Sequence, residues 1–136
     1  MRVHYELANF VVSAWKLAQK DERIPTSLGV LDRALEMVID DLPERFSSAL
    51  RFAEMPVGRL CVELPDILSC ASESYLITEP SYGHDTVGIR ISAARAMDLL
   101  DDLDIDIAVA ATFGRKLATA VHKECYQLRR TASFIR

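Results

Sequence analysis

The N-terminal third of the chain has the hydrophobic spacing of amphipathic α-helices. Apolar residues three or four positions apart predict a first helix over residues 3–20, with the inner face Val3, Leu7, Phe10, Ala14 and Leu17. A second helix is predicted over residues 28–42, after Pro25 and a capping Thr26 or Ser27, with the inner face Leu28, Leu31, Leu35, Val38 and Leu42. Pro43 fits the first turn of a short third helix that Asp41 can cap and that ends before Pro56, with Phe46, Leu50 and Ala53 on its inner face.

Two segments in the middle of the chain fit both a strand and a helix. Residues 57–64 alternate between apolar and polar, but a helical spacing interrupted at Pro65 covers Val57, Leu60, Leu64, Leu68, Ala71 and Tyr75. Residues 86–91 also alternate, and they compete with a helical stripe made of Ile89, Ala93, Ala96, Leu100 and Leu103. Because the helical patterns account for more positions, we expect helices in both segments.

The last part of the chain predicts one long loop and one long helix. The segment from Glu79 to Gly88 is interrupted by Pro80, Gly83 and polar residues, which is typical of a loop, and we expect it to be the most mobile segment. The final helix begins after Asp104 or Asp106, either of which can cap it. Its apolar face is Ile107, Ala111, Gly114, Leu117, Val121, Cys125 and Leu128.

These patterns predict a mainly α protein, a single domain over residues 1–136 that forms an antiparallel bundle of five or six helices. The alternative is an α+β fold with a small antiparallel sheet from residues 57–64, 75–79 and 86–91. Two helices have apolar residues on more than one side, which leads us to expect a homodimer. The residues concerned are Phe10, Val11 and Trp15 in one helix and Ala34, Val38 and Ile39 in the other.

Composition indicates an ordinary globular protein. Half of the 136 residues are hydrophobic and 26% are charged, so a single core needs no disulfide or metal. The longest stretch without charge, residues 7–15, is too short to cross a membrane, and we expect a cytoplasmic protein with no membrane partner. The three cysteines are widely spaced and contain no C-x-x-C pair, which favours small core residues in a reducing compartment.

Charge is unevenly distributed, and the final helix carries most of the basic excess. Residues 1–106 have a net charge of −9 and residues 107–136 a net charge of +5, within a total of −4. Basic residues recur every seven positions in two neighbouring stripes, Arg115, His122, Arg129, Arg136 and Lys116, Lys123, Arg130. We call these residues the basic face. The expected binding surface on it is Arg115, Lys116, Thr119, His122, Lys123, Tyr126, Arg129 and Arg130. The clustered acids from Asp98 to Asp106 are candidates to neutralise part of it.

No motif in the sequence specifies a reaction, a metal or a cofactor. The aspartates from Asp98 to Asp106 lack the spacing of a calcium loop, and His4, His84 and His122 form no metal-binding pair. His84 lies in the predicted loop with Tyr82 and Asp85, where a surface role is the simpler interpretation. The serines lack the contexts of known nucleophiles, and the five glycines form no phosphate-binding loop.

One pair on the basic face has a recognisable spacing. Arg115 and His122 lie seven positions apart on one helical face, with Tyr126 one turn further on. This arrangement resembles the R-x4-6-H motif of HEPN helical-bundle ribonucleases, although Lys116 stands where that family usually has a small polar residue. The resemblance implies that Arg115 stabilises charge on a phosphate, that His122 transfers a proton, and that two such motifs pair at a dimer interface.

Three functional hypotheses therefore share the basic face. The first is a small helical regulator or adaptor that binds another protein. The second is a nucleic-acid-binding protein whose basic helix contacts phosphates, with affinity that falls steeply as salt rises. The third is a metal-independent ribonuclease that uses Arg115 and His122. The missing catalytic motifs and the acidic total charge favour the first hypothesis.

Overall fold

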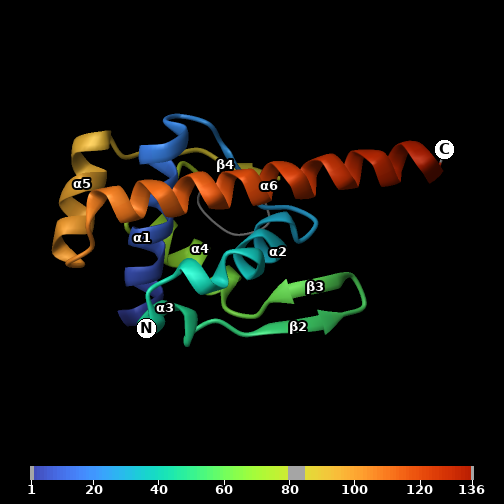
Figure 1. The fold of residues 1–136 in the computed structure, drawn as a ribbon, viewed down its shortest axis with the longest axis horizontal. Coiled ribbons are helices and arrows are strands. Elements are labelled where there is room, and N and C mark those ends of the chain that lie inside the picture. Colours follow the sequence, from blue (N-terminus) through green and yellow to red (C-terminus); the bar gives the residue numbers. More distant parts are fainter. Residues whose placement is uncertain (1, 80–84, 136) are drawn as a thin grey trace.

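The structure, a computed structural model, describes residues 2–79 and 85–135, with side chains through residue 130. The described part of the chain contains six α-helices, one 3-10 helix and two pairs of short antiparallel strands (Figure 1). The elements are α1 (Arg2–Gln19), β1 (Ile24–Pro25), α2 (Val30–Met37), η1 (Ile39–Asp41), α3 (Glu44–Ser47), β2 (Phe52–Met55), β3 (Gly58–Cys61), α4 (Leu64–Glu73), β4 (Thr86–Val87), α5 (Ala93–Asp102) and α6 (Ile107–Ile135). The prediction of a mainly α fold is confirmed, and a small antiparallel component accompanies it.

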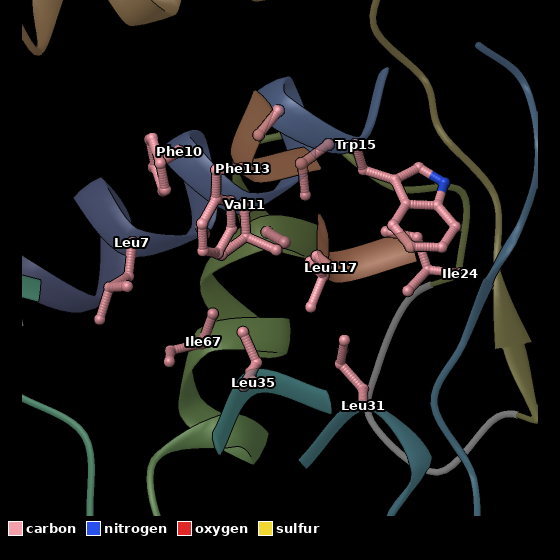
Figure 2. Close-up of a cluster of buried hydrophobic side chains, with 14 of the residues drawn as sticks. Leu7, Phe10, Val11, Trp15, Ile24, Leu31, Leu35, Ile67, Phe113 and Leu117 are labelled. Atoms are coloured by element: carbon pink, nitrogen blue, oxygen red, sulfur yellow. The ribbon is translucent and has the colours of Figure 1, made fainter. Parts of the chain in front are cut away.

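Helix α1 lies at the centre of the core, and its middle is buried on nearly every side. All residues from Leu7 to Trp15 except Asn9 are buried, and α1 packs against α4, α5 and α6. Figure 2 shows Phe10 and Trp15 of α1 beside side chains from α2, α4 and α6. The Trp15 indole Nε1 donates a hydrogen bond to the Glu22 carbonyl at 2.7 Å, so the one polar atom of this side chain is satisfied.

Helix α6 is the longest element and lies across α1 (Figure 1). A Cβ atom built at Gly114 would lie 2.2 Å from the Ala14 carbonyl oxygen and 2.9 Å from the Ala18 Cβ, so only glycine permits this approach. No side chain from His122 to Arg130 is buried. Figure 1 accordingly shows the C-terminal part of α6 extending beyond the other elements.

The prediction of a helix over residues 57–64 is wrong. Phe52–Met55 and Gly58–Cys61 form an antiparallel hairpin, and the third predicted helix is reduced to Glu44–Ser47, so Ala53 lies in a strand. Two buried carboxylates hold the hairpin: Asp32 accepts from the Cys61 amide at 2.8 Å, and Glu63 accepts from the Arg51 amide at 2.7 Å. Pro65 lies in the first turn of α4, where its missing N–H costs nothing, so it begins a helix and does not interrupt one.

The prediction of a helix that includes residues 86–91 is also wrong, because the observed helix, α5, begins only at Ala93. Ser92 caps α5 by accepting from the Arg95 amide at 3.1 Å. The preceding residues are extended, and β4 pairs with β1 while Ile77 pairs with Ile89. The alternative prediction of a small sheet was therefore right in part: residues 86–91 contain β4, and residues 75–79 contribute a single bridge at Ile77, but the strand that pairs with β4 is β1, which was not predicted. Residues 57–64, however, contribute to a separate hairpin and not to that sheet.

Several finer predictions need correction. The second helix is shorter than expected, because α2 ends at Met37 and a 3-10 turn, η1, replaces its last turn. Asp104 does not cap α6: its φ of 60° ends α5, while the Asp106 carbonyl accepts from the Ala110 amide at 3.0 Å. Ile107, assigned to the inner face of the final helix, is 43% exposed. Residues 80–84 of the predicted mobile loop, including Tyr82 and His84, lie outside the described residues.

The apolar residues on which the homodimer prediction rested are mostly covered within one chain. Phe10, Val11, Trp15, Ala34 and Val38 are buried, and Ile39 is partly buried. Their spacing on two helices therefore does not by itself call for a second copy, and the homodimer stays a prediction.

Candidate functional site

The basic face lies on the outer side of α6. The inner side of this helix is formed by Ala110, Phe113, Leu117, Ala118 and Val121, which are at most 1% exposed. The residues of the expected binding surface, Arg115, Lys116, Thr119, His122, Lys123, Tyr126, Arg129 and Arg130, are all exposed. Arg136 lies outside the described residues. The sequence therefore predicted the orientation of this helix correctly.

Each basic stripe contacts one acid from outside α6. The Lys116 Nζ atom lies 3.0 Å from Asp41 Oδ1 at the end of η1. On the other side of α6, His122 Nε2 lies 3.1 Å from Glu22 Oε1, just beyond α1. The prediction that Asp98 to Asp106 neutralise the basic face is wrong within the described residues. Asp98, Asp101 and Asp102 lie in α5, Asp104 and Asp106 follow it, and none of them forms an ion pair with a described residue of α6.

The remaining polar groups of the basic face are held within α6 or point to solvent. The Thr112 and Thr119 hydroxyls donate to the Ala108 and Arg115 carbonyl oxygens, both at 2.9 Å. Arg115 donates to the Thr112 hydroxyl at 3.1 Å. At the far end, the Arg130 guanidinium lies 5.9 Å from the centre of the Tyr126 ring. Lys123 has no ion pair or hydrogen bond with any described residue.

A groove runs between the basic face and the segment formed by α2 and η1. Its first wall is Met37, Val38 and Asp41, and its second wall is Arg115, Lys116, Thr119, Ala120 and Lys123. This compartment has a volume of about 500 Å³. Met37 is 50% exposed here, beside Arg115, Lys116 and Lys123. The groove thus combines an apolar strip with a cationic wall.

The groove continues toward the N-terminal end of α6. A second compartment of about 280 Å³ shares Asp41 and Lys116 with the first, so their ion pair stands between the two. It also contains Phe113 and the 53% exposed Val109. A third compartment of about 450 Å³ shares Val109 and extends to Arg45 of α3. The three compartments follow one another along α6 and share lining residues, and we call them together the α6 groove.

The structure brings together only half of the expected binding surface. Arg115, Lys116, Thr119 and Lys123 line the α6 groove, whereas His122 faces Glu22 and Tyr126, Arg129 and Arg130 lie on the extending end of the helix. Sequence reasoning missed the opposite wall, Met37, Val38 and Asp41. Helical spacing placed Val38 inside the second helix, but nothing local indicates that this segment lies beside α6.

Other charged clusters in the described part of the chain are structural. Burial raises the pKa of Asp32, against the opposing effect of the Cys61 amide. Burial would also raise the pKa of Glu63, but the hydrogen bonds from Arg51 outweigh it and leave the pKa lowered. Both carboxylates fix the hairpin to α2 and α4. Burial raises the pKa of the Cys61 thiol to about 11, so it is an unreactive core group.

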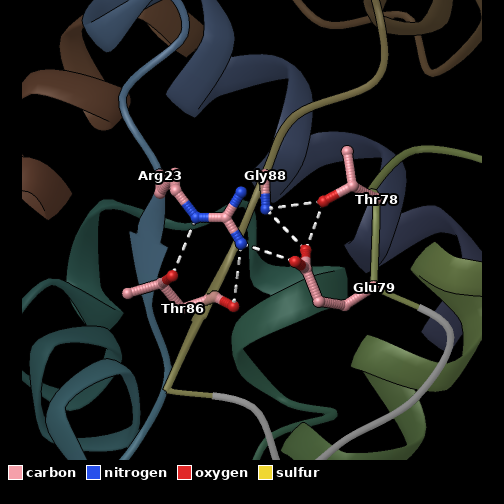
Figure 3. Close-up of polar contacts among 5 residues, drawn as sticks. All are labelled: Arg23, Thr78, Glu79, Thr86 and Gly88. Atoms are coloured by element: carbon pink, nitrogen blue, oxygen red, sulfur yellow. Dashed lines mark hydrogen bonds and ion pairs between the residues drawn. The ribbon is translucent and has the colours of Figure 1, made fainter.

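A second polar cluster joins the segments around β1 and β4 (Figure 3). Arg23 Nε donates to the Thr86 hydroxyl at 2.8 Å, and its guanidinium pairs with Glu79. The hydrogen bond from Thr78, followed by the Gly88 amide and Arg23, lowers the pKa of Glu79 to about 2. Each of these polar groups has a hydrogen-bond or ion-pair partner within the cluster. The cluster therefore holds chain segments together and offers no unpaired group to a ligand.

No group of three metal-ligating side chains occurs among the described residues, and no helix there is long and apolar enough to cross a membrane. Comparisons with protein-family models, with curated proteins and with solved structures find no match to this chain. The α6 groove is therefore the feature on which a functional proposal has to rest.

Proposed function

We propose that this chain is an interaction protein that binds a protein partner in the α6 groove. The observation that carries the proposal is the combination in one groove of exposed apolar side chains and a cationic wall. Met37 and Val109 offer area that gains free energy on burial, and Arg115, Lys116 and Lys123 select an acidic partner. Peptide segments that bind in grooves combine apolar anchors with charged contacts of this kind.

The acids beside the basic face favour a protein partner over nucleic acid. Asp41 and Glu22 flank the two stripes on opposite sides of α6, and both would lie close to a phosphate backbone that follows the helix. The apolar strip at Met37 has no counterpart in a phosphate backbone. Nucleic-acid binding through the basic face remains the alternative, and a low-salt gel shift with RNA and DNA tests it.

A photo-crosslinking amino acid at Thr119 tests the proposal directly. This position lies inside the groove, and the matched control is the same amino acid at Asp66, an exposed position of α4. In extract of the source cells, we expect a discrete protein adduct from position 119 and none from position 66. Lys123→Glu in the same chain should remove that adduct. Equal adducts from both positions, or an adduct unaffected by Lys123→Glu, would contradict the proposal.

A ribonuclease is the second candidate, and one observation favours it. Arg115 and His122 are both exposed on the outer side of α6, and the Glu22 carboxylate orients the His122 ring. Cleavage of a labelled RNA that stops in His122→Ala while binding persists would support this function. Light scattering provides the second test, because the motif that these residues resemble works at a dimer interface.

A further inference from the structure

We infer that the occupant of the α6 groove is an acidic amphipathic helix of the partner, with two carboxylates seven residues apart. The inference rests on the proposed function and specifies the chemistry that the partner presents. Four features of the groove carry it: the spacing of two lysines, the ion pair that already occupies one of them, the absence of a partner for the other among the described residues, and the apolar strip beside them.

The lysine spacing selects a helix. Lys116 and Lys123 line the same wall, and seven residues of α6 separate them by about 10.5 Å along its axis. Residues seven apart in a second helix repeat the same distance on nearly the same side. An extended chain covers this distance in about three residues, and side chains three apart in a strand point to opposite sides. An extended segment therefore matches the two lysines less closely than a helix does, because residues two or four apart on one side of a strand lie about 6.6 or 13 Å apart.

The ion pair with Asp41 shows that a carboxylate fits against this wall. Asp41 Oδ1 lies 3.0 Å from Lys116 Nζ, and the pair is half-exposed, so a carboxylate from outside can reach the same amine. Lys123, two turns further along, has no ion pair with any described residue. Within the described part of the chain, Lys116 thus has an internal carboxylate and Lys123 has none. An external acid therefore gains most at Lys123.

The apolar side of the occupant follows from the opposite wall. Met37, Val38 and Ala120 lie beside the lysines, and Met37 keeps half of its surface exposed. A helix whose acids face Lys116 and Lys123 needs apolar residues on the adjacent side to cover Met37. Methionine suits this role because its flexible side chain adapts to different apolar surfaces.

Fluorescence anisotropy with the full chain and two labelled 21-residue peptides tests the inference. Both peptides have an alanine and glutamine background, two leucines and two glutamates. In the first peptide the glutamates are seven residues apart, and in the control they are nine apart, which turns the second to the opposite side. At low salt we expect the first peptide to bind about fivefold tighter, the equivalent of one lost surface ion pair. Equal affinities for two peptides of equal helicity would overturn the inference.

Removal of the internal carboxylate, that of Asp41, gives a second test, in which binding should become tighter. Asp41→Asn removes the competitor at Lys116 and should tighten binding of the first peptide about twofold to fivefold. The control is Asp40→Asn, which removes the same charge one residue away. Asp40 does not line the groove, so the affinity of this variant for the first peptide should stay unchanged. Equal tightening by both variants would show a general charge effect and overturn the inference.

The outcomes separate this inference from the proposed function. If the peptides bind equally but the adduct from position 119 still depends on Lys123, the partner occupies the groove in another form and only the inference fails. If a 21-nucleotide RNA binds tighter than either peptide and the adduct is missing, both fail.

Discussion

The close approach of α1 and α6 at Gly114 makes this position a sensitive test of the fold with a single added methyl group. In Gly114→Ala the new Cβ would lie 2.2 Å from the Ala14 carbonyl oxygen, where ordinary contact requires about 3.4 Å. The neighbouring atom belongs to the backbone of a buried helix and cannot rotate away. The two helices must therefore move apart by about 1 Å, which reduces packing along the length of the crossing.

The magnitude follows from two opposing effects. Overpacking of a core costs roughly 1–3 kcal/mol, and the backbone origin of this contact places it at the upper end. Alanine in place of glycine in a helix interior stabilises the helix by about 1 kcal/mol. We therefore expect the free energy of unfolding to fall by about 2 kcal/mol, and the Tm by about 8 °C for a chain of this length.

Urea denaturation followed by circular dichroism measures this change. Thr119→Ala, on the exposed side of the same helix, is the control, and its free energy of unfolding should change by less than about 0.5 kcal/mol. The refuting result is an increase in stability for Gly114→Ala of about 1 kcal/mol. That increase would mean that helix propensity acts alone and that the helices are not in close contact at this position.

Two further predictions concern stability. Lys20 follows α1 with a φ of 57°, which costs an L-residue roughly 1 kcal/mol, so Lys20→Gly should raise the free energy of unfolding by about that amount while Lys20→Ala should not. The lowered pKa of Glu79 means that its interactions stabilise the fold above its unfolded value of 4.5 and are lost as pH falls toward about 2. Urea midpoints between pH 5 and pH 2 should fall less steeply for Glu79→Gln than for the parent chain, and equal slopes would count against the Glu79 cluster.

Long periodic segments could be predicted from the sequence because their helical spacing has one interpretation. Helix α1 and the exposed orientation of the basic face are the clearest cases. The helices predicted over residues 57–64 and 86–91 are wrong, because a short apolar alternation is compatible with both a helix and a strand. Partners distant in the sequence decide which of the two forms. Those partners are Asp32, which binds the Cys61 amide, and Ile77, which pairs with Ile89. Local spacing contains no information about either.

The α6 groove was only half predictable for the same physical reason. Its cationic wall lies on one helix, so a repeat of seven residues revealed it. Its opposite wall, Met37, Val38 and Asp41, comes from a segment about eighty positions earlier in the chain. The Lys116 to Asp41 ion pair connects them, and no pattern within either segment indicates it.

The central claim is that the position of the positive charge in the groove, and not its amount, determines partner binding. Two double variants change the net charge equally: Lys116→Glu with Lys123→Glu inside the groove, and Arg129→Glu with Arg130→Glu on the extending end of α6. We expect the first to abolish the adduct at position 119 with urea stability retained, and the second to preserve it. Equal loss of the adduct in both variants would contradict the claim.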